Sequence, residues 1–161
     1  MSAEIASPGY VFSPEVPTDE RRQWMGILAR ADGAAIAVLL AAGPPLPTHV
    51  RLRGPDTGLV MVCGRQGGDG RPFNLGEMTV TRCSVTLDGG LIGHAYVAGR
   101  DAGQAELAAV LDAALQDPAR RPELLARVIQ PLAKVQAERA AQDAARAAAT
   151  RVEFFTMATM R

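Results

Sequence analysis

Histidine, cysteine and aromatic side chains are scarce in this sequence, and their scarcity limits the chemistry that the chain can perform. The 161 residues include two cysteines and two histidines, and aromatic residues make up 4% of the total. Cys63 and Cys83 form no Cys-x-x-Cys pair, and two thiols are too few to hold an iron–sulfur cluster. His49 and His94 lack the helical spacing of metal ligands. We therefore expect no metal or other cofactor in this chain, and redox chemistry is not indicated.

Two of these side chains have structural interpretations that are more common than catalytic ones. Arg82 could activate the neighbouring thiol of Cys83, but a cysteine in a strand-like run is more often buried and unreactive. His94 lies in a run that is predicted to be a strand, and we interpret it as a hydrogen-bonded strand residue rather than a general base.

The chain also has no excess of either charge and no long apolar run. Lysine plus arginine and aspartate plus glutamate number 17 each, so no overall field attracts nucleic acid or an acidic membrane. The longest strongly apolar run, Ala34 to Ala42, is about half the length of a membrane span. No export signal opens the chain. We expect no nucleic-acid or membrane partner and a cytoplasmic location.

Apolar residues make up 48% of the sequence, which is enough for one domain with a core. Residues 1–17, rich in proline and acid, are predicted to be a disordered leader, residues 18–157 a single domain, and residues 158–161 a tail. A helix is predicted to begin at Thr18, which follows Pro17 and precedes two acidic residues. A second helix is expected after the break at Asp32-Gly33.

Four strand-like segments follow, and they predict an antiparallel sheet. The second is apolar throughout, as in a central strand, whereas the third changes the parity of its alternation and suggests a bulge or a strand with two buried sides. Turn-forming residues at Gly54–Gly58 separate the first two segments, and Asp88–Gly90 predicts a hairpin before the fourth. The predicted strands are 50–53, 59–63, 78–87 and 91–98.

The C-terminal part of the chain is predicted to be helical. Asp101 and Gln104 have the spacing of a capping box at the start of one helix. Pro122 begins another, and Pro131 kinks or restarts it. Residues 133–149 are rich in alanine, so this part either packs closely on another helix or projects toward a partner. We therefore predict an α+β fold, with an antiparallel sheet of about four strands, N-terminal helices and a C-terminal helical segment.

The most distinctive segment runs from Arg65 to Glu77 and carries four glycines between two strand-like runs. Its density of glycine, proline and asparagine predicts an ordered loop. Arg65 and Arg71, beside N–H groups that glycine leaves accessible, suggest an anion site. However, the loop lacks the known phosphate-binding glycine motifs and leads into a strand rather than a helix. The alternative is a structural excursion whose charged groups contact solvent or a partner protein.

The last dozen residues hold Phe154 and Phe155, half of the four phenylalanines in the chain. Chain ends are usually polar. Adjacent aromatic residues at such a place either pack back on the domain or enter a pocket of a partner. The residues themselves leave both alternatives open.

Four segments together resemble the PhnG family, a subunit of the bacterial carbon–phosphorus lyase core complex. The glycine-rich segment does so through Arg65-x-Gly67-Gly68-x-Gly70-x-x-Phe73 and Gly76-Glu77-x-Thr79-x-Thr81-Arg82. The other segments that resemble the family are 22–29, 93–101 and 149–157. The resemblance covers residues 18 to 157, which is nearly the whole chain.

This resemblance implies a role in the use of phosphonates as a phosphorus source. In the family, the subunit assembles with a nucleosidase-like subunit, a radical S-adenosylmethionine subunit and a further structural subunit, each present twice. With an ATP-binding-cassette-type accessory protein, the assembly displaces adenine from ATP and forms α-D-ribose 1-phosphonate 5-triphosphate. Pyrophosphate is then removed, and the radical subunit breaks the carbon–phosphorus bond. The partners would therefore use ATP, S-adenosylmethionine and an iron–sulfur cluster, and this chain would be an obligate, noncatalytic subunit.

Neither the residues nor the resemblance assigns a catalytic residue to this chain. We interpret the glycine-rich segment and the aromatic tail as docking surfaces. For Glu77 and Arg82, an internal ion pair is the simpler alternative. For the whole chain, the alternative is a stand-alone nucleotide- or anion-binding protein or enzyme that uses the glycine-rich loop. The candidate partner- or anion-contact residues are Arg65, Gly67, Gly68, Gly70, Phe73, Glu77, Arg82, Arg100, Arg151, Phe154 and Phe155.

Overall fold

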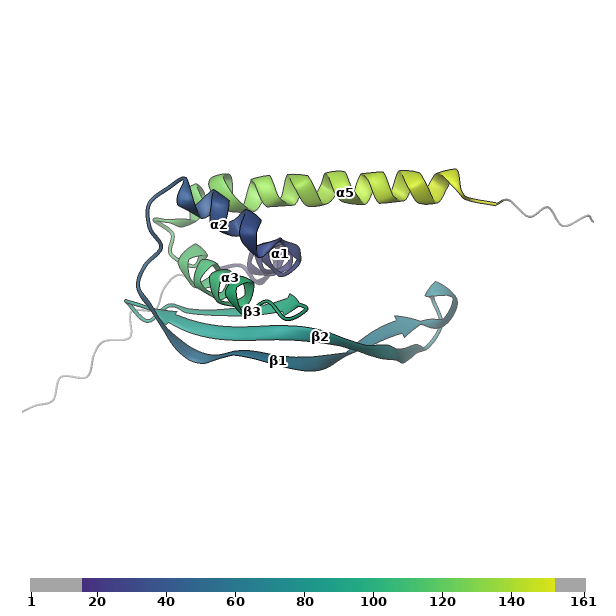
Figure 1. The fold of residues 1–161 in the computed structure, drawn as a ribbon, viewed down its shortest axis with the longest axis horizontal. Coiled ribbons are helices and arrows are strands. Elements are labelled where there is room, and N and C mark those ends of the chain that lie inside the picture. Colours follow the sequence, from purple (N-terminus) through teal and green to yellow (C-terminus); the bar gives the residue numbers. More distant parts are fainter. Residues whose placement is uncertain (1–15, 153–161) are drawn as a thin grey trace, which may run out of the picture.

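A three-stranded antiparallel sheet with helices on one face makes up the structure, a computed structural model that describes residues 16–152 (Figure 1). The strands are β1 (His49–Arg65), β2 (Pro72–Leu87) and β3 (Ile92–Ala98), in the order β1-β2-β3. The predicted α+β class and the antiparallel sheet are confirmed. The predicted leader and the end of the chain after Val152, including Phe154 and Phe155, lie outside the described residues.

The sheet has three strands rather than four, because the first two predicted strands are one. The chain passes through Gly54–Gly58 without reversing, and Asp56 already pairs with Arg82 of β2. The register shifts on either side of Arg53, so the turn-forming residues make irregularities within β1. Glycine and proline serve at bulges as well as at turns. Such residues form a bulge rather than a turn here because β2 pairs with the chain on both sides of them.

Strand β2 lies in the centre and has buried residues on both sides, as its alternation indicated. Thr81, Cys83 and Val85 face the helices, while Val80 is buried on the opposite face. The predicted turn at Asp88–Gly90 is confirmed, because the N–H of Leu87 donates to the carbonyl oxygen of Leu91 at 2.9 Å. Strand β3 follows as the far edge of the sheet.

Helix α3 (Ala102–Leu115) lies between the sheet and the other helices (Figure 1). It is buried almost all round, because β2 and β3 cover one side and α1 and α2 another. Gly93 of β3 allows this close approach: a Cβ atom there would overlap the carbonyl oxygen of Ala109 and the amide nitrogen of Ala113 on α3. The largest core side chains are Trp24, Leu28, Ile36, Leu111 and Leu115.

The N-terminal helices are α1 (Thr18–Arg30) and α2 (Gly33–Ala41), and both begin where the sequence predicts. The carboxylate of Asp32 accepts from the N–H of Ala34 at 2.8 Å and caps α2. Within residues 16–152 no single helix is long and apolar enough to cross a membrane. In this part of the chain, α1 and α2 taken together reach such a length and composition, and they meet at a bend of 111°.

The predicted capping box at the start of α3 is half formed. Asp101 accepts from the N–H of Gln104 at 2.8 Å, as expected of an N-cap. The side chain of Gln104 turns inward instead of back to Asp101, and its Nε2 donates to the carbonyl oxygens of Leu28 and Ala31. It therefore satisfies two acceptors at the end of α1.

The last helical run begins with α4 (Arg121–Leu124) and ends with α5 (Gln130–Ala149). Between them, residues Leu125–Ile129 form a wide π-helical turn. The turn comes just before Pro131, whose ring nitrogen cannot donate to the preceding turn. From Ala137 onward α5 is exposed, so the alanine-rich part projects from the body, one of the two predicted outcomes. Figure 1 shows this part extending in the same direction as the β1–β2 hairpin.

Candidate interaction surface

The β1–β2 hairpin continues well beyond the helices and β3, and we call its residues 59–79 the hairpin arm (Figure 1). Pairing of β2 with β3 ends at Val80 and Ala98, whereas pairing of β2 with β1 continues to Pro72 and Arg65. The arm is therefore a two-stranded ribbon that none of the described helices covers. A two-stranded ribbon is marginally stable alone, and this one is anchored by the three-stranded part.

Both faces of the hairpin arm expose apolar side chains. Leu59 and Met61 are 62% and 59% exposed. They lie on the same face of the sheet that the helices cover elsewhere, where β3 is also present. Val62 and Met78 are exposed on the other face. Leu75, 64% exposed, lies over Gly64, where a Cβ atom would overlap its side chain. Exposed apolar side chains gathered on one element favour contact with another protein.

A tight turn closes the arm. Gln66–Gly68 form one 3₁₀ turn, and the N–H of Gly70 donates to the carbonyl oxygen of Gln66 at 2.8 Å. Gly67 and Gly68 adopt φ angles of 64° and 93°, which side chains with a Cβ atom disfavour. The guanidinium of Arg65 donates to the carbonyl oxygen of Gly70 at 3.1 Å. Three of the glycines and Arg65 therefore hold the turn itself in shape.

The predicted long loop from Arg65 to Glu77 is mostly strand. Residues 72 to 77 belong to β2 and pair with β1, and only residues 66–71 lie outside the two strands. Phe73 and Glu77 are thereby placed on the arm: Phe73 is opposite Gly64, close to the turn that Gly67, Gly68 and Gly70 form, and Glu77 is opposite Met61, farther along the ribbon. The glycine-rich composition indicated a loop, but cross-strand pairing extends the hairpin through most of it.

The other candidate contact residues that the structure describes are not at the arm. Arg82 lies in the part of β2 that β3 also pairs, Arg100 follows β3, and Arg151 follows α5. No ion pair joins Glu77 and Arg82 in the described part of the chain. The reason is geometric: five positions apart on one strand, the two side chains point to opposite faces of the sheet.

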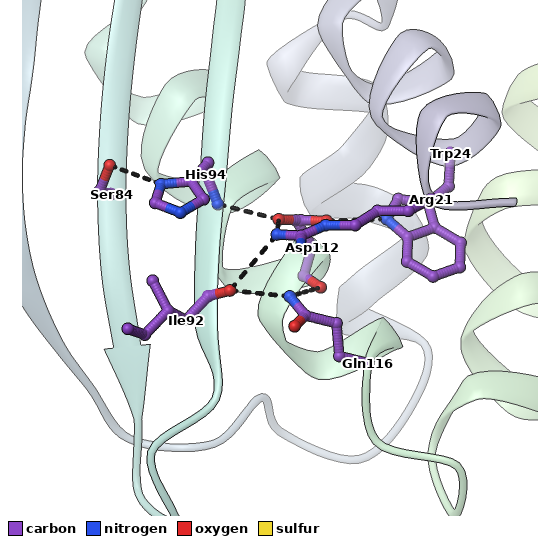
Figure 2. A network of polar contacts seen from close by, with 7 residues as sticks. All are labelled: Arg21, Trp24, Ser84, Ile92, His94, Asp112 and Gln116. Carbon is purple, nitrogen blue, oxygen red and sulfur yellow. Dashed lines mark hydrogen bonds and ion pairs between the residues drawn. The ribbon is translucent and has the colours of Figure 1, made fainter. Parts of the chain in front are cut away.

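A buried carboxylate that the sequence analysis did not single out joins α1, α3 and β3 (Figure 2). The side chain of Asp112 is completely buried. It accepts from Arg21 Nη2 at 2.7 Å, from Trp24 Nε1 at 2.9 Å and from the backbone N–H of His94 at 2.9 Å. A buried carboxylate requires such a set of donors. In the sequence, its one indication is an acidic residue inside the apolar run of α3.

The same cluster closes part of the free edge of β3. The carbonyl oxygen of Ile92 accepts from Gln116 Nε2 at 2.7 Å and from Arg21 Nη2 at 3.5 Å (Figure 2). The side chains of Gln116 and Arg21 therefore satisfy a backbone group that a further strand would otherwise bind.

The imidazole of His94 contacts the hydroxyl of Ser84 at 2.9 Å, which confirms the interpretation of this histidine as a hydrogen-bonded strand residue.

Glu106 on α3 holds the start of β1. Its carboxylate accepts from Arg51 Nε and Nη2 at 2.7 Å and 2.6 Å and contacts His49 Nε2 at 2.9 Å. The hydrogen bonds from Arg51 and then from His49 lower the pKa of Glu106 to about 2. A bidentate pair of this kind fixes geometry as well as charge.

Acid is expected to remove the stabilisation that Glu106 supplies. Because the folded-state pKa of about 2 lies below the ordinary value of 4.5, the contribution is complete above pH 4.5 and is lost as the pH falls toward 2. Glu106→Gln carries no charge to titrate. Urea unfolding should find the wild type more stable than Glu106→Gln at neutral pH, with the difference shrinking through this window. A difference that stays constant from pH 5 to pH 2 would contradict the assignment.

The cysteines and the acidic residues supply no further site. Cys83 is buried, as expected, and burial raises the pKa of its thiol. Among the described residues, no three histidine, cysteine or acidic side chains lie close enough to hold a metal ion. The surface that stands out is the hairpin arm, whose backbone and apolar side chains suit contact with protein.

The fold and the arm together define a small α+β protein with an exposed, apolar β-ribbon. The chain belongs to the family described as phosphonate metabolism protein PhnG, which it matches over residues 19–159. It is also similar to the alpha-D-ribose 1-methylphosphonate 5-triphosphate synthase subunit PhnG of Rhizobium meliloti (strain 1021). The two are 43% identical over 145 residues, which are 90% of this chain and 92% of that protein. The family resemblance found in the sequence is thereby confirmed.

Proposed function

We propose that this chain is a noncatalytic, obligate subunit of a carbon–phosphorus lyase core complex. It supports the step that transfers the ribose 5-triphosphate moiety of ATP to a phosphonate and releases adenine, before cleavage of the carbon–phosphorus bond. The observation that carries the proposal is the hairpin arm, whose exposed leucine, methionine and phenylalanine side chains need a partner to cover them. The name of the R. meliloti protein, a subunit of the synthase, supports the same role.

The partners in this proposal are the nucleosidase-like, radical S-adenosylmethionine and structural subunits, with an ATP-binding-cassette-type accessory protein. ATP, S-adenosylmethionine and the iron–sulfur cluster belong to those partners, and the complex works in the cytoplasm. The hairpin arm and its turn are one docking surface of this chain. The aromatic segment at Phe154 and Phe155 is a second, because truncation of an aromatic anchor at an interface centre can cost more than about 2 kcal/mol.

Co-expression with the proposed partner subunits tests this function. A tag on this chain should recover a stable complex, and mass determination should give a fixed stoichiometry. The complex with the accessory protein should release adenine from ATP in the presence of methylphosphonate, whereas the isolated chain should neither bind nor convert ATP. Recovery of the tagged chain alone would contradict the subunit role. Binding of ATP by the isolated chain would favour a stand-alone nucleotide-binding protein.

Alanine at both tail positions separates the two docking surfaces. Phe154→Ala with Phe155→Ala should weaken recovery of the partners and leave the thermal unfolding of the isolated chain unchanged. Full recovery would remove the tail from the interface while leaving the hairpin arm as the docking surface.

A further inference from the structure

Strand β1 is an edge strand along its whole length, because the sheet order is β1-β2-β3 and no described segment pairs with its outer side. An edge of this length is a template for another strand unless charge, proline or bulges block it. The two halves of β1 differ in these features. The difference indicates where a strand can add.

The half of β1 nearest the body is blocked. Arg51 and Arg53 place charges on this part, Pro55 lies within it, and the register shifts at two places between Arg51 and Asp56. Charged residues, proline and irregular pairing are the devices that protect natural edge strands.

Within the hairpin arm, β1 carries none of these devices from Gly58 to Val62. This stretch has neither a charged residue nor a proline, and its register with β2 is regular up to the shift between Val62 and Cys63. The opposite free edge of the arm, on β2, is blocked in the same ways as the body half of β1. It contains Pro72, the charged Glu77 and a register shift beside Leu75.

The hydrogen bonds of β2 identify the residues of this unblocked edge whose backbone N–H and C=O groups point outward. The carbonyl oxygen of Thr79 accepts from the N–H of Gly99, so the backbone N–H and C=O groups of Thr79 point away from β1. The backbone groups of its neighbours Val80 and Met78 therefore point toward β1, where these residues are opposite Gly58 and Val60. Because neighbouring residues of a strand point their N–H and C=O groups to opposite sides, Leu59 and Met61 direct theirs away from β2.

We propose that residues 58–62 of β1 accept an uncharged, apolar β-strand of another subunit along this edge, so that the sheet gains a fourth strand. The proposal rests on the proposed function and specifies how the hairpin arm docks. The added strand lies beside Leu59 and Met61 on one face and beside Val62 on the other, all exposed in the isolated chain. The side chains of the added strand are therefore apolar on both faces. Its backbone forms hydrogen bonds with the outward N–H and C=O groups of Leu59 and Met61.

Residue-resolved amide hydrogen exchange on the isolated chain and on the co-expressed complex tests the proposal. On assembly, exchange at Leu59 and Met61 should slow by at least about tenfold, because their amides gain partners. Exchange at Val60, whose amide faces β2, should change less. Unchanged exchange at Leu59 and Met61 within an assembled complex would overturn strand addition and leave the subunit role standing. Failure of any complex to form would overturn both.

The isolated chain supplies a further outcome of the same measurement. Protection of Leu59 and Met61 that rises with the concentration of the isolated chain would identify a second copy of this chain as the added strand. Such protection would overturn the assignment to another subunit.

Met61→Pro separates backbone pairing from side-chain contact. Proline removes one outward N–H that the isolated sheet does not use, so the thermal midpoint of the isolated chain should stay close to that of the wild type. Recovery of the partner subunits should fall about tenfold, as expected for a lost backbone hydrogen bond and a displaced strand. Met61→Ala keeps the N–H and should lower recovery less. An equal loss of partner recovery in both variants, or full recovery of the partners by Met61→Pro, would overturn the proposal. If Met61→Pro does not fold, the exchange measurement decides.

Discussion

Asp112→Ala is expected to lower the free energy of unfolding by about 3 kcal/mol, at the lower end of the range for breaking a buried ion pair. The substitution leaves the guanidinium of Arg21, the indole N–H of Trp24 and the backbone N–H of His94 without their common acceptor. The indole N–H of Trp24 is buried, so water cannot replace the carboxylate there without opening the contact between α1, α3 and β3. Urea unfolding followed by circular dichroism measures the loss.

Asp143→Ala is the matched control for this substitution. Asp143 is an acidic helix residue that is 75% exposed and lies 3.8 Å from Arg146. An exposed pair of this kind contributes about 0–1 kcal/mol, so the control should unfold close to the wild type. If Asp112→Ala is no less stable than Asp143→Ala, the buried cluster does not hold the helices to β3.

Gly93→Ala is expected to cost roughly 3 kcal/mol, because overpacking a rigid contact is as damaging as a cavity. The new Cβ atom would overlap backbone atoms of Ala109 and Ala113, which cannot rotate away as a side chain can. Helix α3 would have to move off the sheet, and its buried residues link the sheet to α1 and α2. The thermal midpoint and the urea midpoint should both fall.

The control for this substitution is Gly58→Ala. Gly58 is also a strand glycine, but a Cβ atom there meets no atom within 4 Å. Alanine at such a position should be neutral, or stabilising by about 0.4–1 kcal/mol through the unfolded chain. Equal stability of Gly93→Ala and Gly58→Ala would show that α3 does not approach β3 as closely as the structure describes.

Local features of this fold were predictable because their causes lie within a few residues. Asp32 and Asp101 cap the helices that follow them, and their side chains bond N–H groups two and three positions away. The hairpin at Asp88–Gly90 likewise follows from the turn residues themselves. The family resemblance adds the identity of the whole chain, because several ordered segments match at once.

The hairpin arm was predicted only in part, because bulges and turns use the same residues. The sequence of Gly54–Gly58 alone predicts a turn. In the structure, β2 pairs with the residues on both sides of it, so β1 is one strand. The glycine-rich segment read alone is a long loop, yet residues 72–77 pair with β1. The candidate residues Gly67, Gly68, Gly70 and Phe73 thus belong to the hairpin arm, whereas Arg82, Arg100 and Arg151 lie outside it.

The sequence by itself determined the α+β class, most element boundaries and the family, because these depend on periodicity, caps and ordered motifs along the chain. Only the tertiary structure decided that the sheet has three strands, that Asp112 joins Arg21, Trp24 and His94, and that the arm of β1 and β2 stands free of the helices. Each of these depends on which distant segments meet. Such meetings are set by the packing of α3 against the sheet and by cross-strand register, which no local stretch of sequence specifies.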